Sequence, residues 1–150
     1  MDKKKTIIVD VDGTIADMTH RLHYIRGPGK KDWDKCFSQM DKDTPIENVV
    51  SMVIGFAEDY SIAIVTARPE RYREVTETWL KENKIVYDVL LMRKDNDKRD
   101  DDIIKRELLN KYFKKDNVYL AIDDRPRVVN MYKEELGIDK VLDVGDGTEF

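Results

Sequence analysis

The sequence lacks the features that mark secreted or membrane-embedded proteins. Cys36 is the single cysteine among 150 residues, so the chain forms no internal disulfide, and nothing else indicates secretion. No hydrophobic run is long enough to cross a bilayer, and the polar start, Met-Asp-Lys-Lys-Lys, has no apolar segment of the kind that a signal peptide needs. We therefore expect a cytoplasmic protein with no membrane association, in which Cys36 has only a packing role.

The chain also lacks a surplus of positive charge. Its formal net charge of −4 argues against a protein that coats long nucleic acid, but it leaves open an enzyme that grips one phosphorylated end. The two histidines, His20 and His23, have no third ligand nearby in the sequence, so we interpret them as surface or loop residues. Internal repeats and low-complexity linkers are absent too, and 150 residues suit one compact domain spanning 1–150.

The most informative stretch that is present lies at residues 6–14, Thr-Ile-Ile-Val-Asp-Val-Asp-Gly-Thr. Its continuous apolar run is typical of a strand that is buried on both faces. This run leads directly into Asp10 and Asp12. Carboxylates at the end of a buried strand are costly unless something compensates them, so the pattern indicates a metal ion or a reaction.

Strands and helices alternate along the rest of the chain. We predict strands at 7–9, 62–65, 87–92, 118–122 and 141–144, and helices at about 46–59, 69–83, 101–113 and 126–136. This alternation predicts an α/β fold of the Rossmann-like kind, a doubly wound parallel sheet with helices on both faces. Residues 17–44 read as a loop followed by a short helix at about 32–40. The next helix is expected to start with Thr44 as its cap, Pro45 in its first turn and Glu47 closing a capping box.

Polar side chains follow three of the predicted strands. Asp10 and Asp12 follow the first, Thr66 follows the second, and Asp123 and Asp124 follow the fourth. The carboxyl ends of parallel strands form the ligand-binding crevice of such a sheet, so these side chains should meet there. Four carboxylates together repel one another, and Mg²⁺ suits such an oxygen-rich set. We expect Asp10, Asp12 and Asp123 as its ligands, with Asp124 in support.

The same residues suit phosphoryl transfer. Asp10 can attack a bound phosphoryl group as a nucleophile, and Asp12 is placed to protonate the leaving oxygen and later to deprotonate water. Thr66 offers a hydroxyl donor to a phosphoryl oxygen. Lys105 is the candidate cation for the transferring group, although a solvated helix lysine is the ordinary interpretation of such a residue.

These motifs, in this order, resemble those of the haloacid-dehalogenase-like phosphohydrolases. Asp-x-Asp-Gly-Thr after a buried strand, Thr66, Lys105 and Asp123-Asp124 carry the resemblance. It implies a parallel sheet, a first-strand aspartate nucleophile, Mg²⁺ and an aspartyl-phosphate intermediate.

Over nearly the whole chain, the sequence is also similar to the 3′-phosphatase domain of phage-type polynucleotide kinase–phosphatase. Thr-Ala-Arg-Pro at 66–69, the segment 97–105 and Ala-Ile-Asp-Asp-Arg at 121–125 carry this narrower resemblance. It implies 3′-phosphorylated DNA or RNA ends as substrate. It also carries function onto Arg21 and Arg68, which can clamp a phosphate, and onto Asp101, which shares a helix face with Lys105 and can orient it.

No Gly-x-x-x-x-Gly-Lys-Ser/Thr phosphate loop occurs, so we expect no kinase domain in this chain, which would be free-standing or part of something larger. The gaps between motifs leave room for only a minimal cap, and an open site suits a polymer end. The alternatives are a nucleotidase or small-molecule phosphatase of the same superfamily and, from another class, a phosphoacceptor receiver domain, which would not need Asp12.

Overall fold

The computed structural model describes residues 4–148, and a five-stranded sheet forms their centre. Its strand order is β5-β4-β1-β6-β7, and every adjacent pair is parallel, which confirms the predicted α/β fold. The strands are β1 (Thr6–Val9), β4 (Ser61–Pro69), β5 (Val89–Arg93), β6 (Val118–Asp123) and β7 (Val141–Asp143).

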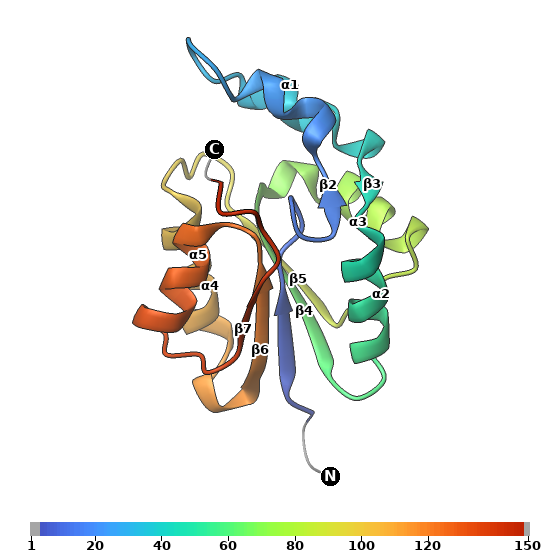
Figure 1. Cartoon of the computed structure of the whole chain (residues 1–150), viewed down its shortest axis with the longest axis vertical. Coiled ribbons are helices and arrows are strands. Elements are labelled where there is room, and N and C mark those ends of the chain that lie inside the picture. The colour runs from blue at the N-terminus through green and yellow to red at the C-terminus, as the bar shows by residue number, and fades with distance from the viewer. Residues whose placement is uncertain (1–3, 149–150) are drawn as a thin grey trace.

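Helices cover both faces of this sheet (Figure 1). The residues of β1 explain why, because Ile7 and Val9 point to one face and Ile8 to the other. The first face packs on α2 (Glu47–Phe56) and α3 (Arg73–Glu82). The second packs on α4 (Asp101–Tyr112) and α5 (Pro126–Asn130), which continues as a π-helical turn over Met131–Glu135. All three β1 side chains are fully buried, as the continuous apolar run predicts.

The order of the strands places the functional crevice at β1. From β1 the chain runs outward through β4 to β5, then crosses to the other side of β1 for β6 and β7. Ligands bind at the carboxyl ends of the strands where the order reverses in this way. The tip of β1, which leads into Asp10, is therefore the centre of the binding edge.

A small cap rises over this edge from the segment between β1 and α2. The strands β2 (Ala16–Asp17) and β3 (Thr44–Pro45) pair antiparallel as its stalk. Above them lie a 3₁₀ helix, η1 (Thr19–Tyr24), the helix α1 (Trp33–Ser38) and a 3₁₀ turn, η2 (Met40–Lys42), as Figure 1 shows. The cap has its own apolar cluster around Met18, Ile25 and Cys36. The expected minimal cap is confirmed, and Cys36 is buried within it.

Two predictions about α2 are wrong. Thr44 and Pro45 do not open the helix, because they are engaged as β3, where Thr44 pairs with Asp17. The helix begins at Glu47 instead, and the residue before it, Ile46, provides no side-chain cap. Helical spacing also predicts an apolar, core-facing stripe that includes Val49, Val50, Val53 and Ile54. The three valines are buried, but Ile54 is exposed.

The strand predicted at 62–65 also ends differently from the prediction. β4 runs through Thr66 to Pro69, and a 3₁₀ turn, η3 (Glu70–Tyr72), precedes α3, so the helix does not begin at Pro69. This extension keeps Arg68 in extended backbone at the edge of the crevice. A shorter turn, η4 (Lys115–Asn117), leads into β6. No helix within residues 4–148 is both long and apolar enough to cross a membrane.

Candidate active site

Three carboxylates meet at the centre of the crevice. Asp10 follows β1, Asp123 ends the neighbouring β6, and Asp124 comes next in the chain. One oxygen from each lies within 4.8 Å of the others. Asp10 and Asp123 are buried. This is the convergence that the strand ends predict.

Lys105 lies against two of these acids. Its Nζ donates to Asp10 Oδ1 at 2.8 Å and to Asp123 Oδ2 at 2.6 Å. The side chain is only 2% exposed, which excludes the solvated helix lysine as an interpretation. Burial by itself lowers the pKa of Lys105, but Asp10 and Asp123 outweigh it and hold that pKa well above its usual value. Lys105 is therefore a fixed positive charge in the crevice.

The charges of this group do not balance. When all three carboxylates are ionised, they face one ammonium, which leaves two negative charges in excess. Burial, and then the charge of Asp10, raise the pKa of Asp123 and of Asp124, as expected for acids crowded together out of water. A hard divalent cation with oxygen ligands would remove both the excess charge and the repulsion. The residues present therefore fit Mg²⁺.

The Asp-Gly-Thr turn positions two of the acids. Thr14 Oγ1 donates its proton to Asp10 Oδ2 at 2.9 Å, and Thr14 Oγ1 also lies 3.2 Å from Asp124 Oδ1. Gly13 has φ +81°, and a Cβ there would collide with the Asp124 carboxylate. Only glycine combines this backbone conformation with so close an approach. The turn thus brings the β1 and β6 acids together.

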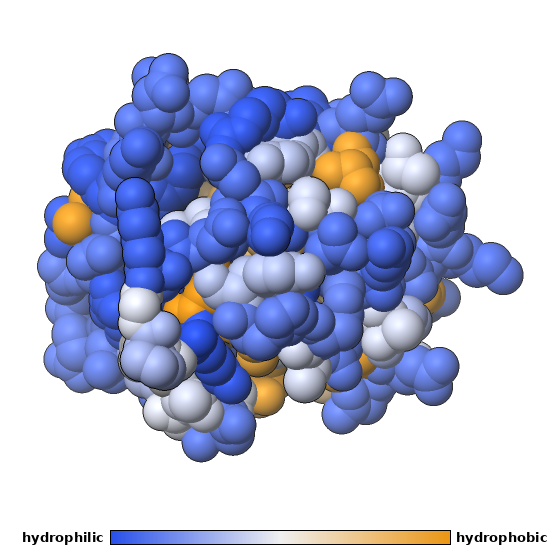
Figure 2. All heavy atoms as spheres, turned by 90° about the horizontal axis from the view of Figure 1, so that it is seen from above, coloured by the Kyte–Doolittle hydropathy of each residue, from blue (hydrophilic) through white to orange (hydrophobic). Residues whose placement is uncertain are grey.

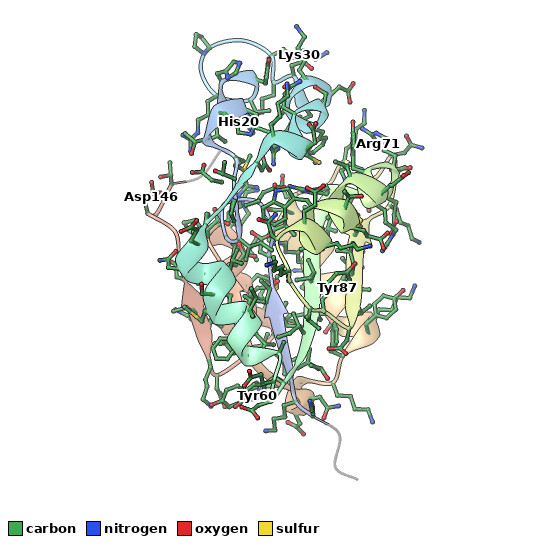
Figure 3. All side chains as sticks on the ribbon, turned by 90° about the vertical axis from the view of Figure 1, so that its right-hand side faces the viewer. His20, Lys30, Tyr60, Arg71, Tyr87 and Asp146 are labelled. Atoms are coloured by element: carbon green, nitrogen blue, oxygen red, sulfur yellow. The ribbon has the colours of Figure 1, made fainter. Side chains whose placement is uncertain are left out.

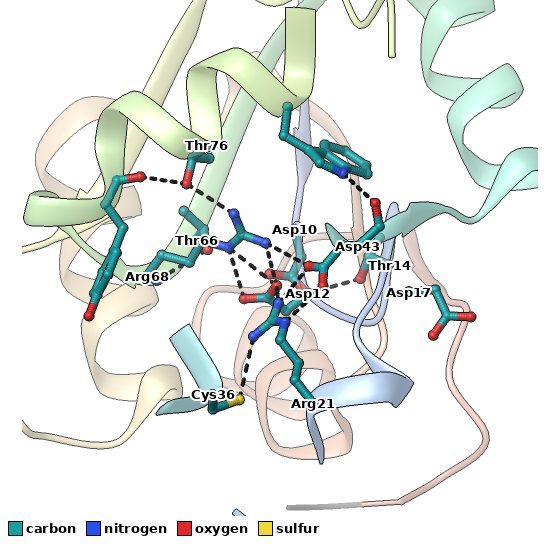
Figure 4. Close-up of polar contacts among 12 residues, drawn as sticks. Asp10, Asp12, Thr14, Asp17, Arg21, Cys36, Asp43, Thr66, Arg68 and Thr76 are labelled. Carbon is teal, nitrogen blue, oxygen red and sulfur yellow. Dashed lines mark hydrogen bonds and ion pairs between the residues drawn. The ribbon is translucent and has the colours of Figure 1, made fainter. Parts of the chain in front are cut away.

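A second group of charges lies beside the first, and it is balanced. Figure 4 shows Arg21 and Arg68 pointing toward Asp12 and Asp43. Arg21 donates to Asp43 through Nε and Nη2 at 2.8 and 2.7 Å, and Nη2 also reaches Asp12 Oδ1 at 2.5 Å. Arg68 Nη2 lies 2.7 Å from Asp12 Oδ1 and 3.2 Å from Asp43 Oδ2. Both arginines are buried, and two cations match two anions.

The contacts of Asp12 in this arrangement differ from its predicted role as a metal ligand. Burial alone would raise the pKa of Asp12, but Arg68 and Arg21 hold it far below its usual range. Asp12 was expected to be a metal ligand, yet its carboxylate contributes no oxygen to the cluster of three acids found among the described residues. Arg21 and Arg68, expected to clamp phosphate, are instead turned to carboxylates.

Asp43 belongs to this second group of charges, although the sequence predicts no role for it. It lies in the polar connector after η2, where an aspartate looks like any other solvated residue. In the structure it is buried between the two arginines, accepts a hydrogen bond from Trp79 Nε1 through its carbonyl, and lies 2.7 Å from His20 Nε2. His20 is exposed, as expected of a surface residue, but its ring also contacts this buried carboxylate. A charge-rich run without helical or strand periodicity gave no local signal for either contact.

Two further predicted residues line the same crevice. Thr66 is buried, and its hydroxyl oxygen accepts the backbone N–H of Arg68 at 3.2 Å. None of the residues 4–148 accepts the Thr66 hydroxyl proton within hydrogen-bond distance, so that proton is available to a ligand. Asp101 shares a helix face with Lys105, but its carboxylate accepts from Arg125 at 2.8 Å rather than orienting the lysine. Arg125 follows the acidic pair of β6 and had no predicted role.

A cleft of about 1310 Å³ opens between the cap and the carboxyl end of the sheet. Its lining includes Asp10, Asp12, Thr66, Arg68, Lys105, Asp123 and Asp124, but not Arg21 or Asp43. Viewed from above, this end of the molecule is mostly hydrophilic, with small hydrophobic areas between polar side chains (Figure 2). The cleft exceeds the ~300–1,000 Å³ of ordinary small-molecule pockets. The residues that line it besides the acids include many cations: Lys30, Lys31, Arg68, Arg71, Arg93, Lys94, Lys98, Arg99, Lys105, Arg125 and Arg127.

The fold and the acids at its strand ends are those of a haloacid-dehalogenase-like phosphatase. A haloacid dehalogenase-like hydrolase from Streptococcus pneumoniae superposes with a TM-score of 0.64 at 16% identity, covering 99% of this chain and 89% of that one. At this identity the likeness concerns the fold alone.

The family is more specific than the fold. The family described as the polynucleotide kinase PNKP phosphatase domain matches residues 4–149, and the chain belongs to it. This membership makes the chain a phosphatase, that is, a phosphoric monoester hydrolase. The receiver-domain alternative is thereby excluded.

Two relatives extend the comparison. A chain in the solved structure of the Pnkp1/Rnl/Hen1 complex matches with a TM-score of 0.81 and 33% identity, covering 99% of this chain. A protein of Autographa californica nuclear polyhedrosis virus named "Putative bifunctional polynucleotide kinase/RNA ligase" is 28% identical over 145 residues, or 93% of this chain. The present chain spans 48% of the first relative and 19% of the second. Both relatives therefore contain much that this chain does not match.

Proposed function

We propose that this chain is a polynucleotide 3′-phosphatase, which removes the phosphate from 3′-phosphorylated DNA or RNA ends during nucleic-acid repair. The observation that carries the proposal is the juxtaposition of Asp10, its acidic neighbours and Lys105 beneath a large, cation-lined cleft. Membership of the PNKP phosphatase family supports the reaction, and a second relative, from a solved RNA repair complex at 31% identity, supports the substrate class. The single cysteine fits a reducing compartment, so we place the activity in the cytoplasm.

The proposed reaction has two steps. An oxygen of the Asp10 carboxylate attacks phosphorus, the bond from phosphorus to the 3′ oxygen breaks, and Asp12 supplies the proton that the leaving hydroxyl needs. A water then attacks the same phosphorus, Asp12 takes up a proton from it, and the bond to Asp10 breaks to release inorganic phosphate. Thr66 donates its free hydroxyl proton to a phosphoryl oxygen, and Lys105 offsets the negative charge on the transferring group.

Mg²⁺ would be held by Asp10, Asp123 and Asp124, rather than by the Asp12 side chain. When bound, it would supply neutralising charge for these acids and for the phosphate. The chain's own contribution is to fix the acids, through Thr14, Lys105 and the backbone N–H groups of Asp124 and Arg125, which donate to Asp123 Oδ1 at 2.9 and 3.1 Å.

Arg21 and Arg68 keep Asp12 in its carboxylate form and aim it at the crevice. This is the form that accepts a proton from water in the second step. Acting as an acid in the first step requires a weaker hold from the arginines. An incoming phosphate dianion beside Arg68, which borders the cleft, would compete for the guanidinium and weaken that hold, so that Asp12 takes up a proton from solvent before it donates that proton to the leaving oxygen. Arg68 then serves as both a positioning residue and a phosphate contact, and Arg21 serves as a positioning residue.

A substrate panel tests the proposal. With Mg²⁺, the protein should release phosphate from 3′-phosphorylated DNA and RNA oligonucleotides but not from 5′-phosphorylated ones, and Asp12→Asn should slow release by roughly 100- to 10,000-fold. Faster turnover of mononucleotides or small phosphate esters than of 3′-phosphorylated ends would instead establish the alternative, a nucleotidase or small-molecule phosphatase.

A further inference from the structure

The cap presents an aromatic surface to the catalytic cleft. Trp33, the first residue of α1, lines the cleft and is 37% exposed. Its ring centroid lies 5.5 Å from that of Phe37, which in turn lies 5.2 Å from that of Tyr72 on η3. The three rings form a row that bridges the cap and the end of the sheet. The other tryptophan, Trp79, is buried and has no access to the cleft.

The cleft that Trp33 lines also contains lysines without an ion-pair partner among the described residues. Four lysines line the cleft without an ion pair to any of the residues 4–148 within 4 Å: Lys30, Lys31, Lys94 and Lys98. Lys31 Nζ also lies 5.8 Å from the centre of the Trp33 ring. Figure 3 shows Lys30 at the outer tip of the cap and Arg71 on the rim at the sheet end. Arg71 differs from the lysines, since Asp34 and Asp95 engage its guanidinium.

A packing role accounts for Phe37 and Tyr72 but not for Trp33. A ring needed only for packing should turn inward, whereas Trp33 keeps an accessible face in a cleft that also contains the nucleophile. A small phosphorylated metabolite would need neither this face nor four free lysines. Aromatic faces flanked by cations are the means by which proteins hold single-stranded nucleic acid without reading its sequence.

We propose that Trp33 stacks against a base near the 3′ end of a single-stranded polynucleotide, while the four lysines contact its backbone phosphates. This inference rests on the proposed function, because it identifies how that substrate is held. Base stacking on an aromatic side chain tolerates every base, because each base has a π face, so binding should depend little on sequence.

Kinetics on two substrates test this role. The experiment compares kcat/KM for a 3′-phosphorylated single-stranded oligonucleotide with kcat/KM for 4-nitrophenyl phosphate. Trp33→Ala should lower the ratio of the two about tenfold or more, mainly by raising KM for the oligonucleotide, and Trp33→Phe should recover most of it. The matched control is Tyr112→Ala, which removes a 52% exposed aromatic residue with a neighbouring lysine outside the cleft and should leave the ratio unchanged.

Fluorescence provides a readout that does not depend on turnover. In an Asp10→Asn background, the same oligonucleotide should quench tryptophan emission, and Trp33→Phe should abolish this quenching while Trp79→Phe preserves it. An unchanged ratio in Trp33→Ala, or undiminished quenching in Trp33→Phe, overturns the role of Trp33. Failure of the wild-type protein to dephosphorylate the oligonucleotide while it hydrolyses the small ester would instead overturn the proposed function.

Discussion

At the scale of single residues, Asp43 holds the second charge group together. Together with Asp12 it balances the charges of Arg21 and Arg68, which are both buried, and it keeps them oriented toward Asp12. Removing one partner of a buried ion pair is costly because the other charge stays out of water. Asp43 is thus a positioning residue at the junction of cap and sheet.

We expect Asp43→Ala to lower the free energy of unfolding by about 3–5 kcal/mol, because it leaves two buried guanidiniums with a single carboxylate. Activity of the folded fraction should fall as well, since Asp12 loses its fixed surroundings. Denaturant unfolding measures the first effect, with Asp41→Ala as the control on the exposed side of the same turn. Equal losses in the two variants would show that the buried group is not the cause.

Asp124, unlike Asp43, should lower the stability of the protein when no metal is bound. Burial, followed by the charges of Asp10 and Asp123, raises its pKa from 3.8 to about 9. Its favourable contribution to folding is therefore complete below about pH 4 and is lost as the pH rises toward 9. In the absence of divalent cations at pH 8, the folded protein keeps Asp124 largely protonated whereas the unfolded chain ionises it, and this difference in proton binding lowers the free energy of unfolding.

Without metal at pH 8, Asp124→Asn should therefore melt at a higher temperature than the wild type, and this advantage should vanish near pH 4. Mg²⁺ should raise the melting temperature of the wild type more than that of the variant. Thermal melts with EDTA and with Mg²⁺ measure both effects, and Asp139→Asn, an exposed change, is the control. A variant that gains as much from Mg²⁺ as the wild type would remove Asp124 from the metal site.

At the scale of elements, the short turn after β1 aligns the acids of two strands. Val11 O accepts backbone N–H groups from Thr14, Ile15 and Ala16 at 3.0–3.1 Å, which closes the turn tightly. Gly13 then passes directly over Asp124. The motif Asp-x-Asp-Gly-Thr is thus both a set of reactive groups and a piece of required backbone geometry.

Two glycine variants separate these requirements. Gly13→Ala and Gly27→Ala both place a side chain at positive φ, which costs each roughly 1–2 kcal/mol. Only the first collides with Asp124, because nothing lies within 4 Å of a Cβ at Gly27. We expect activity to fall on the order of 100-fold in Gly13→Ala alone, as a displaced catalytic group would cause. Comparable activity in the two variants would refute this close-approach argument.

The sequence could predict the site residues that lie at strand ends, but not those that lie in the cap. Residues at strand ends were predictable, because the strand period and the parallel order bring Asp10, Thr66 and Asp123 to one edge. Residues from the cap were not, because the path of residues 17–44 follows from tertiary contacts. Asp43 and Trp33 come from that segment. The false helix cap at Thr44 has the same origin, since pairing with Asp17 outweighed local capping preference.

At the scale of the whole molecule, the two charge groups have different places and different roles. The acidic group, with Lys105, lies at the centre of the sheet edge, while the balanced arginine group ties the cap to that edge. The cleft between the cap and the sheet stays large enough for a polymer end. A phosphatase for small metabolites gains from a lid that excludes water, whereas this cap contributes only short helices and turns beside an open cleft.

The measurement that bears most directly on this account follows the phosphoryl group itself. A 3′-phosphorylated oligonucleotide with a radiolabelled terminal phosphate is mixed with the protein and Mg²⁺, the reaction is quenched in acid, and the labelled peptide is identified. We predict that label appears transiently on the peptide that contains Asp10, and that Asp10→Asn neither acquires label nor releases phosphate. Release of phosphate by Asp10→Asn at the wild-type rate, or label on another residue, would contradict the account.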